Sequence, residues 1–164
     1  MNYHNITKCD MLNGEGLRVV LWVSGCTHYC PNCQNQQTWS HNSGILFDKE
    51  AKKELFAELE KDYISGVTFS GGDPLSELNR YEILELAKEI KNTFPTKNIW
   101  LYTGYSYCEI EGLKGIEYID ILVDGRYIET LNFPSPKWRG SSNQRVIDVK
   151  ESLRSGQVVT KEDI

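Results

Sequence analysis

Four short apolar runs alternate with helical patterns along the chain, and this alternation constrains the fold more than any other feature. The runs are rich in β-branched and aromatic residues and span residues 19–23, 67–69, 99–102 and 119–123. Because they show little polar alternation, they read as strands that are buried on both faces. Strands that alternate with helices predict an α/β fold with a mostly parallel sheet.

Three helices are predicted between these strands. Asp48 can cap the first helix, and Ser76 can cap the second, which Pro95 would stop. A third and shorter helix is expected from Ser106 to about Leu113. Each of the three would cross from the end of one strand to the start of the next.

Composition narrows the class of protein. The chain has 164 residues, 40% apolar and 25% charged, which predicts one compact domain rather than a disordered chain. Its 18 basic and 23 acidic side chains give a net charge of −5, which disfavours a broad nucleic-acid surface. No run approaches the roughly 18 apolar residues of a membrane span, and residues 1–10 lack the apolar core of a signal peptide. We therefore expect a cytoplasmic protein that binds neither nucleic acid nor membrane.

Small polar loops follow all four predicted strands. They lie at residues 24–26, 70–74, 103–105 and 124–126. Parallel sheets bind ligands at the carboxyl ends of their strands, so these loops are expected to converge on one site.

The first of these loops carries three cysteines in a C-x3-C-x2-C spacing. Cys26, Cys30 and Cys33 are close enough in sequence to wrap one metal cluster, and thiolates are the usual ligands of iron–sulfur clusters. Three local thiolates would leave one iron of a [4Fe–4S] cube without a local protein ligand. An iron that is open in this way can bind and activate a substrate.

Two other uses of these cysteines stay open at this point. A structural zinc site could combine them with His28 or His41. Alternatively, Cys9 or Cys108 could complete a closed cluster that only carries electrons. We expect both of these cysteines to be inert, and we expect His28 to face water rather than to tune a cluster.

The later loops supply further candidate ligand contacts. Gly71 and Gly72 lack side chains, so backbone can approach a ligand closely, and Asp73 adds negative charge beside them. Thr103 and Asp124 are candidates for contacts at the next two strand ends. Taken without the cysteine loop, ordinary turn chemistry is the simpler explanation of each of these residues.

A cysteine loop after the first strand and a Gly-Gly-acid-Pro loop after the second resemble the radical S-adenosylmethionine (SAM) enzymes. Within that superfamily the chain is similar to the activating proteins of anaerobic ribonucleoside-triphosphate reductases. The stretches that carry this closer resemblance are residues 1–4, 13–18, 23–26, 38–39, 42–44, 70–75, 102–105, 122–125 and, most distinctively, Trp-Arg-Gly-Ser-Ser-Asn-Gln at 138–144.

The resemblance implies a fold and a pair of cofactors. The fold would be a partial (βα) barrel over residues 1–149. Residues 150–164 lie beyond the resemblance, and their polar composition predicts a frayed helix or a disordered extension. Cys26, Cys30 and Cys33 would ligate a [4Fe–4S] cluster whose fourth iron SAM chelates. Reductive cleavage of SAM would yield methionine and a 5′-deoxyadenosyl radical, and that radical would generate a glycyl radical on the reductase.

The resemblance also implies contacts and partners. SAM would lie against Asn32, Cys33 and Gln34 and against the candidates of the later loops. Residue 32 is aromatic in many superfamily members, and the acid at residue 73 is usually Glu, so the side-chain roles of Asn32 and Asp73 are open. The partners would be the large subunit of the reductase and an electron donor such as flavodoxin, and a homodimer is compatible with the family.

A partial barrel has a lateral opening, which a large protein substrate could cover to keep a radical from water. This favours the reductase over a small molecule as the substrate. The alternatives are a short radical SAM enzyme acting on a small molecule, an activase of a different glycyl-radical enzyme, a zinc-stabilised interaction module and a ferredoxin-like electron carrier.

Overall fold

The computed structural model describes residues 1–161, and within that range it forms one seven-stranded sheet. The strands are β1 (Asn2–Asp10), β2 (Arg18–Val23), β3 (Ile45–Leu46), β4 (Gly66–Gly71), β5 (Asn98–Tyr102), β6 (Ile121–Asp124) and β7 (Arg145–Asp148). Their spatial order is β3-β1-β2-β4-β5-β6-β7.

The four strands that the apolar runs predict form the centre of this sheet. They are β2, β4, β5 and β6, and each pairs in parallel with the next. One register row crosses all four strands through Leu21, Phe69, Leu101 and Leu122, each of them completely buried. The α/β class and the parallel centre are therefore confirmed.

The edges of the sheet correct the prediction of a mostly parallel sheet. Within residues 1–161, three of the six strand pairings are antiparallel, namely β1 with β2, β1 with β3, and β6 with β7. The sequence pattern missed these strands because β1 mixes polar and apolar residues and keeps several side chains exposed, while β3 and β7 are short. Only runs that are buried on both faces gave a clear signal.

Four α-helices are described: α1 (Lys49–Leu59), α2 (Arg80–Thr93), α3 (Tyr107–Ile110) and α4 (Val149–Ser155). Asp48 caps α1 as predicted, because its carboxylate accepts a hydrogen bond from the Ala51 N–H at 2.9 Å. Ser76 is wrong as the cap of α2, since residues before Arg80 form turns and Asn79 is the N-cap. The third helix begins after Ser106 as predicted but ends at Ile110, short of Leu113.

The segment after β7 is ordered through residue 161. Helix α4 follows β7 directly, Val149 and Ser152 are buried, and Thr160 forms an antiparallel bridge with Ile147. The predicted polar extension therefore includes most of helix α4 and a segment that is bridged to β7. Its last part, residues 162–164, lies outside the described residues.

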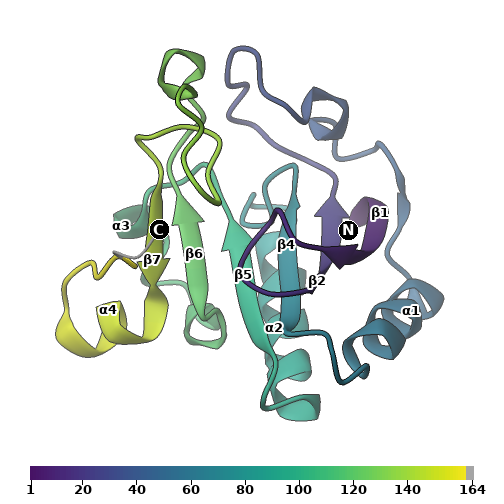
Figure 1. Cartoon of the computed structure of the whole chain (residues 1–164). Coiled ribbons are helices and arrows are strands. Elements are labelled where there is room, and N and C mark those ends of the chain that lie inside the picture. The colour runs from purple at the N-terminus through teal and green to yellow at the C-terminus, as the bar shows by residue number, and fades with distance from the viewer. Residues whose placement is uncertain (162–164) are drawn as a thin grey trace.

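The parallel strands point their carboxyl ends to one end of the molecule. In Figure 1 the arrowheads of β2, β5 and β6 point to the top, where the segments that follow β2 and β6 rise above the sheet. The sequence-predicted loops therefore meet at this end. Among residues 1–161, no helix combines the length and the apolar character that a bilayer crossing demands.

Candidate functional site

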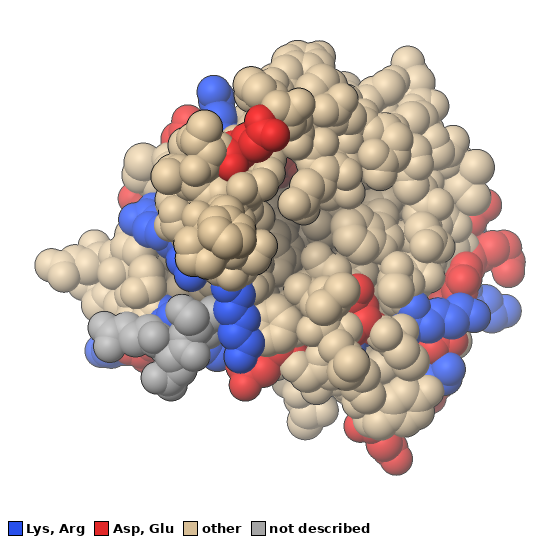
Figure 2. Space-filling model, turned by 45° about the horizontal axis from the view of Figure 1, so that its top comes forward, with Lys and Arg blue, Asp and Glu red and all other residues tan. Residues whose placement is uncertain are grey.

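A cavity of about 760 Å³ lies at the carboxyl ends of the parallel strands. Its walls come from the loops that follow β2, β4, β5 and β6, and residues 11–13 add to them. Figure 2 views this end of the molecule, where the surface is hollowed and mostly uncharged side chains surround the hollow. The loops expected to converge do so around one space.

The cysteine loop is held by backbone hydrogen bonds. The N–H of Gly25 donates to the Thr38 carbonyl at 2.7 Å, and the N–H of Cys26 donates to the Trp39 carbonyl at 3.0 Å. Within the loop, the N–H of Cys33 donates to the Cys30 carbonyl at 3.1 Å. All three cysteines are free, half-buried and part of the cavity wall.

Two of the thiols have distinct surroundings. Burial raises the pKa of the Cys26 thiol to about 11, because desolvation disfavours the thiolate. The Cys33 sulfur accepts a hydrogen bond from the Asn35 N–H at 3.4 Å. A bound cation would reverse the penalty at Cys26, since a metal-coordinating thiol is deprotonated outright.

Gly71 and Gly72 make the close approach between the β4 end and the cysteine loop. A Cβ at Gly72 would lie 2.5 Å from the Gly25 carbonyl oxygen, and Gly71 has a φ of +101°. Any side chain here would push the two loops apart. The glycines therefore serve packing between protein segments as well as lining the cavity.

Asp73 is buried, and both of its carboxylate oxygens accept hydrogen bonds. It accepts from the Leu75 N–H at 2.9 Å, from the Thr103 hydroxyl at 2.9 and 3.0 Å, and from the Gly104 N–H at 3.0 Å. His28 Nε2 lies 2.6 Å from the same carboxylate. Asp73 thus joins the loops after β2, β4 and β5.

The expectation that His28 faces water is wrong. Its side chain is 5% exposed, and its ring packs edge-on against Tyr105 with centroids 4.6 Å apart. Sequence reasoning missed this role because His28 and Asp73 are 45 residues apart. The only available signal was that both stand in loops that follow parallel strands.

The structure brings together most of the predicted site residues. Those that line the cavity are Cys26, Cys30, Cys33, Gln34, Gly71, Gly72, Asp73 and Thr103. The cavity also includes residues that were not predicted as site residues, Trp22, Trp39, Tyr102 and Tyr127 among them. Trp39 and Tyr102 lie in stretches that carry the family resemblance.

Two predicted residues lie elsewhere in the described part of the chain. Asn32 has a φ of +57° and donates to the exposed Glu129 carboxylate. Asp124 is buried, where it accepts from Arg145 at 2.6 and 3.1 Å and from the Tyr107 N–H at 2.8 Å. Neither of these side chains is part of the cavity wall.

The distinctive Trp-Arg-Gly stretch forms part of the cavity wall. Trp138 packs against Trp100 with ring centroids 5.8 Å apart, and its carbonyl accepts from the Tyr102 hydroxyl at 2.6 Å. Gln144 accepts from the Gly140 and Ser141 N–H groups. The segment is therefore fastened to the sheet and to itself.

The donor set suits a cluster. Each thiolate of a cluster ligand set binds a different iron, so the three sulfurs need not meet at one ion. Within residues 1–161, no three His, Cys, Asp or Glu side chains lie close enough together to hold a single metal ion. Nε2 of His28 is bonded to Asp73, and Nε2 of His41 lies 3.1 Å from the Ser76 hydroxyl.

The two remaining cysteines are not placed to act as further ligands of a cluster at this site. Cys9 and Cys108 are exposed, and neither lines the cavity among the described residues. The Cys108 thiol lies 3.2 Å from the Ser106 hydroxyl. The arrangement can therefore offer three thiolates and an adjoining space to a cluster and a small ligand.

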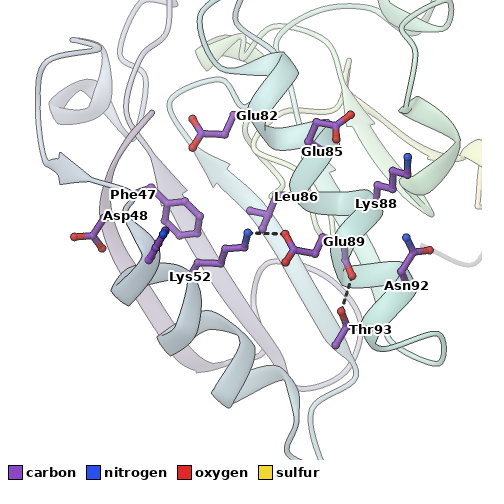
Figure 3. A pocket seen from close by; sticks show the side chains of 11 residues that line it. Phe47, Asp48, Lys52, Glu82, Glu85, Leu86, Lys88, Glu89, Asn92 and Thr93 are labelled. Carbon is purple, nitrogen blue, oxygen red and sulfur yellow. Dashed lines mark hydrogen bonds and ion pairs between the residues drawn. The ribbon is translucent and has the colours of Figure 1, made fainter.

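A second cavity, of about 650 Å³, lies between α1 and α2 and contains none of the predicted site residues. Figure 3 shows the Lys and Glu side chains in its walls, with an ion pair of 2.6 Å between Lys52 and Glu89. Its charges are mixed in sign and half-exposed, which is typical of a solvated helix surface.

Comparison with known families agrees with the iron–sulfur cluster that the cysteine loop predicts. A family described as a 4Fe-4S single cluster domain matches residues 12–147. This span includes the three clustered cysteines and all four parallel strands.

Curated relatives match most of the chain. The chain is 48% identical over 147 residues to a protein from Enterobacteria phage T4, covering 89% of the chain and 93% of the relative. It is 43% identical over 148 residues to one from Haemophilus influenzae, covering 88% and 96%. It is also 43% identical over 150 residues to one from Escherichia coli, covering 89% and 97%. All three are named anaerobic ribonucleoside-triphosphate reductase-activating protein.

Proposed function

The chain belongs to the family of anaerobic ribonucleoside-triphosphate reductase-activating proteins, and from this membership we propose that it is a radical SAM activase. It would cleave SAM reductively and generate the glycyl radical of an anaerobic ribonucleoside-triphosphate reductase. The observation that carries the proposal is that three free cysteines and the Gly71–Gly72 backbone line one cavity.

Three of the cavity residues would hold the iron–sulfur cofactor. Cys26, Cys30 and Cys33 would hold a [4Fe–4S] cluster. When bound, the cluster supplies one electron to the sulfonium of SAM, whose C5′–S bond breaks to give methionine and a 5′-deoxyadenosyl radical. The radical would then take a hydrogen atom from a glycine of the reductase, giving 5′-deoxyadenosine and a glycyl radical.

The chain's own groups would bind and orient SAM. The carbonyls of Gly71 and Gly72 would accept hydrogen bonds from its ammonium group. Backbone of Asn32, Cys33 and Gln34 would lie near its adenine. Thr103 lines the cavity but already donates to Asp73, so its role is to hold that carboxylate.

Asp124 differs from the other proposed SAM contacts because its carboxylate is already bonded within the protein. Its carboxylate would have to leave both Arg145 and the Tyr107 N–H before it could touch SAM. We therefore assign it to holding β6, β7 and α3 together at the site's edge.

The same proposal implies which partners the protein has and how its chain is organised. The large subunit of the reductase would cover the cavity mouth, and a reductant such as flavodoxin would supply the electron. Residues 1–149 would form the radical SAM domain as a partial barrel, in a cytoplasmic protein that is compatible with a homodimer. The open cavity is consistent with a substrate as large as a protein.

The proposal is tested by SAM cleavage under strict anaerobiosis. The chain is reconstituted with iron and sulfide, mixed with SAM and a strong one-electron reductant, and assayed for 5′-deoxyadenosine with and without the reductase. We expect product from the native chain and none from Cys33→Ala. The matched control is Cys9→Ala, which removes an exposed thiol outside the cavity and should keep activity. Absence of product in both conditions from a fully loaded chain would reject the proposal.

A further inference from the structure

His28 is the side chain through which the cysteine loop is fastened to the rest of the site. Among the described residues, two side chains of residues 26–33 form hydrogen bonds with segments distant in sequence, His28 with Asp73 and Asn32 with Glu129. The Cys33 sulfur accepts from Asn35, only two residues further along. The Asn32 contact is at the surface, whereas His28 and Asp73 are 5% and 1% exposed.

The hydrogen-bond pattern around Asp73 defines the direction of this contact. The hydroxyl of Thr103 and two backbone N–H groups already donate to the carboxylate. A carboxylate only accepts, so Nε2 is the protonated nitrogen of His28 and donates the 2.6 Å hydrogen bond.

The ring of His28 is also confined sterically. It packs edge-on against Tyr105 at 4.6 Å, and Gly104 approaches so closely that an added Cβ would lie 2.5 Å from the imidazole Cδ2. No φ in the left-handed region accompanies Gly104, so its backbone suits alanine and only the contact with His28 demands glycine. The imidazole therefore has one position, set by the loop after β5.

From this geometry we infer that His28 is a positioning residue, which holds the cysteine loop, through Asp73, in the orientation in which a cluster on its cysteines would present SAM to the backbone of Gly71 and Gly72. The inference rests on the proposed radical SAM function and assigns a role to a residue between two of the cluster ligands. Asp73 holds His28 on one side and the loop after β5 on the other, so it transmits position rather than contacting SAM through its carboxylate.

The test compares how SAM alters the electron paramagnetic resonance (EPR) signal of the reduced cluster in four variants. His28→Leu removes the N–H donor, and His28→Gln keeps an N–H donor at similar reach. Gly104→Ala displaces an intact His28, and Gly112→Ala is its matched control, because a Cβ there meets nothing within 4 Å and the backbone is equally permissive. Iron and sulfide content, and the unfolding temperature of the cluster-free protein, are measured alongside.

We expect half of the SAM-induced spectral change to require about tenfold more SAM in His28→Leu and Gly104→Ala, which equals about 1.4 kcal/mol of binding free energy. His28→Gln and Gly112→Ala should stay within about threefold of the native chain. A merely structural role would lower the cluster content or the unfolding temperature while leaving the SAM dependence of the loaded fraction unchanged.

The inference is overturned if Gly104→Ala and Gly112→Ala respond alike, or if His28→Gln is impaired as strongly as His28→Leu. Should His28→Leu fail to hold a cluster, the glycine pair and His28→Gln decide the question. A native chain whose loaded cluster shows no spectral response to SAM would instead reject the proposed function itself, so the two failures are distinguishable.

Discussion

Asp73 shows at the scale of one residue how the acid of a motif can hold several loops of a site together. The acid of a Gly-Gly-acid-Pro loop was expected to place negative charge beside SAM. In the structure its carboxylate is buried and accepts from His28, Thr103 and two backbone N–H groups. A buried carboxylate is tolerated only when its oxygens are satisfied, and here the donors that satisfy it come from three loops.

Burial of Cys26 leads to a prediction for the cluster-free protein. Its thiol has a pKa raised to about 11 by desolvation, so at pH 8 it is almost entirely protonated and a poor nucleophile. We expect iodoacetamide to alkylate the exposed Cys108 well before Cys26 at pH 8, and the rate at Cys26 to rise as the pH approaches 11. Peptide mass spectrometry resolves the two sites. Equal rates at pH 8 would contradict the desolvation of the half-buried Cys26 thiol.

The contact between Arg145 and Asp124 gives a second prediction at this scale. Arg145→Ala would leave the buried Asp124 carboxylate without its charged partner. Because the Arg145 side chain is 42% exposed, we expect the free energy of unfolding to fall by about 2 kcal/mol, less than for a fully buried pair. Arg154→Ala breaks an exposed pair with Glu151 and serves as the control, with no measurable change expected. Urea denaturation measures both, and equal stabilities of the two variants would refute the assignment.

At the scale of elements, the segment between β6 and β7 is held in place by hydrogen bonds of one of its own side chains, Gln144. Gln144 accepts from the Gly140 N–H at 2.9 Å and from the Ser141 N–H at 3.0 Å, and it donates to the Gly125 carbonyl at 2.9 Å. One amide side chain thus closes a loop whose Trp138 forms part of the cavity wall. In the sequence this stretch was distinctive only as part of the family resemblance, and its hydrogen bonds became visible in the structure.

Replacing Gln144 with alanine should loosen this segment. The Gly140 and Ser141 amides would lose their acceptor, so we expect their hydrogen exchange to become at least tenfold faster, with a loss of about 1 to 2 kcal/mol in stability. Gln157→Ala, at an exposed position, is the matched control. Hydrogen exchange followed by mass spectrometry gives the readout. Unchanged protection at Gly140 would show that other contacts hold the segment.

Helix starts show the limit of local patterns. Asp48 precedes α1 directly and its carboxylate caps the helix, so the pattern and the structure agree. Ser76 offers the same chemistry, but its carbonyl accepts from the Asn79 and Arg80 N–H groups in a turn, and α2 starts at Arg80. Both residues are good caps in isolation, and the turn after Asp73 decided between them.

At the scale of the whole molecule, the parallel centre was predictable because each central strand is buried on both faces. The antiparallel edges were not, since β1 exposes polar residues and β7 has only four residues. Burial on one face or a short length leaves too weak a pattern in a single sequence. The mixed character of the sheet therefore emerged only from the pairing of strands.

The candidate site, like the sheet, was predictable in part. The three cysteines could be grouped from sequence because they fall within eight residues, and the strand ends could be grouped because parallel strands share a carboxyl edge. The contact of His28 with Asp73 and the withdrawal of Asp124 to Arg145 depend on side-chain packing across loops. Such packing has no signature in spacing.

The most direct test of the proposed activase is transfer of the radical to its protein substrate. The reconstituted chain would be mixed anaerobically with the large subunit of an anaerobic ribonucleoside-triphosphate reductase, SAM and a one-electron reductant, and the sample examined by EPR. We predict a glycyl radical signal with the native chain and with Cys9→Ala, and none with Cys33→Ala. A cluster-loaded chain that cleaves SAM in the presence of the reductase yet leaves it without a glycyl radical would contradict the account.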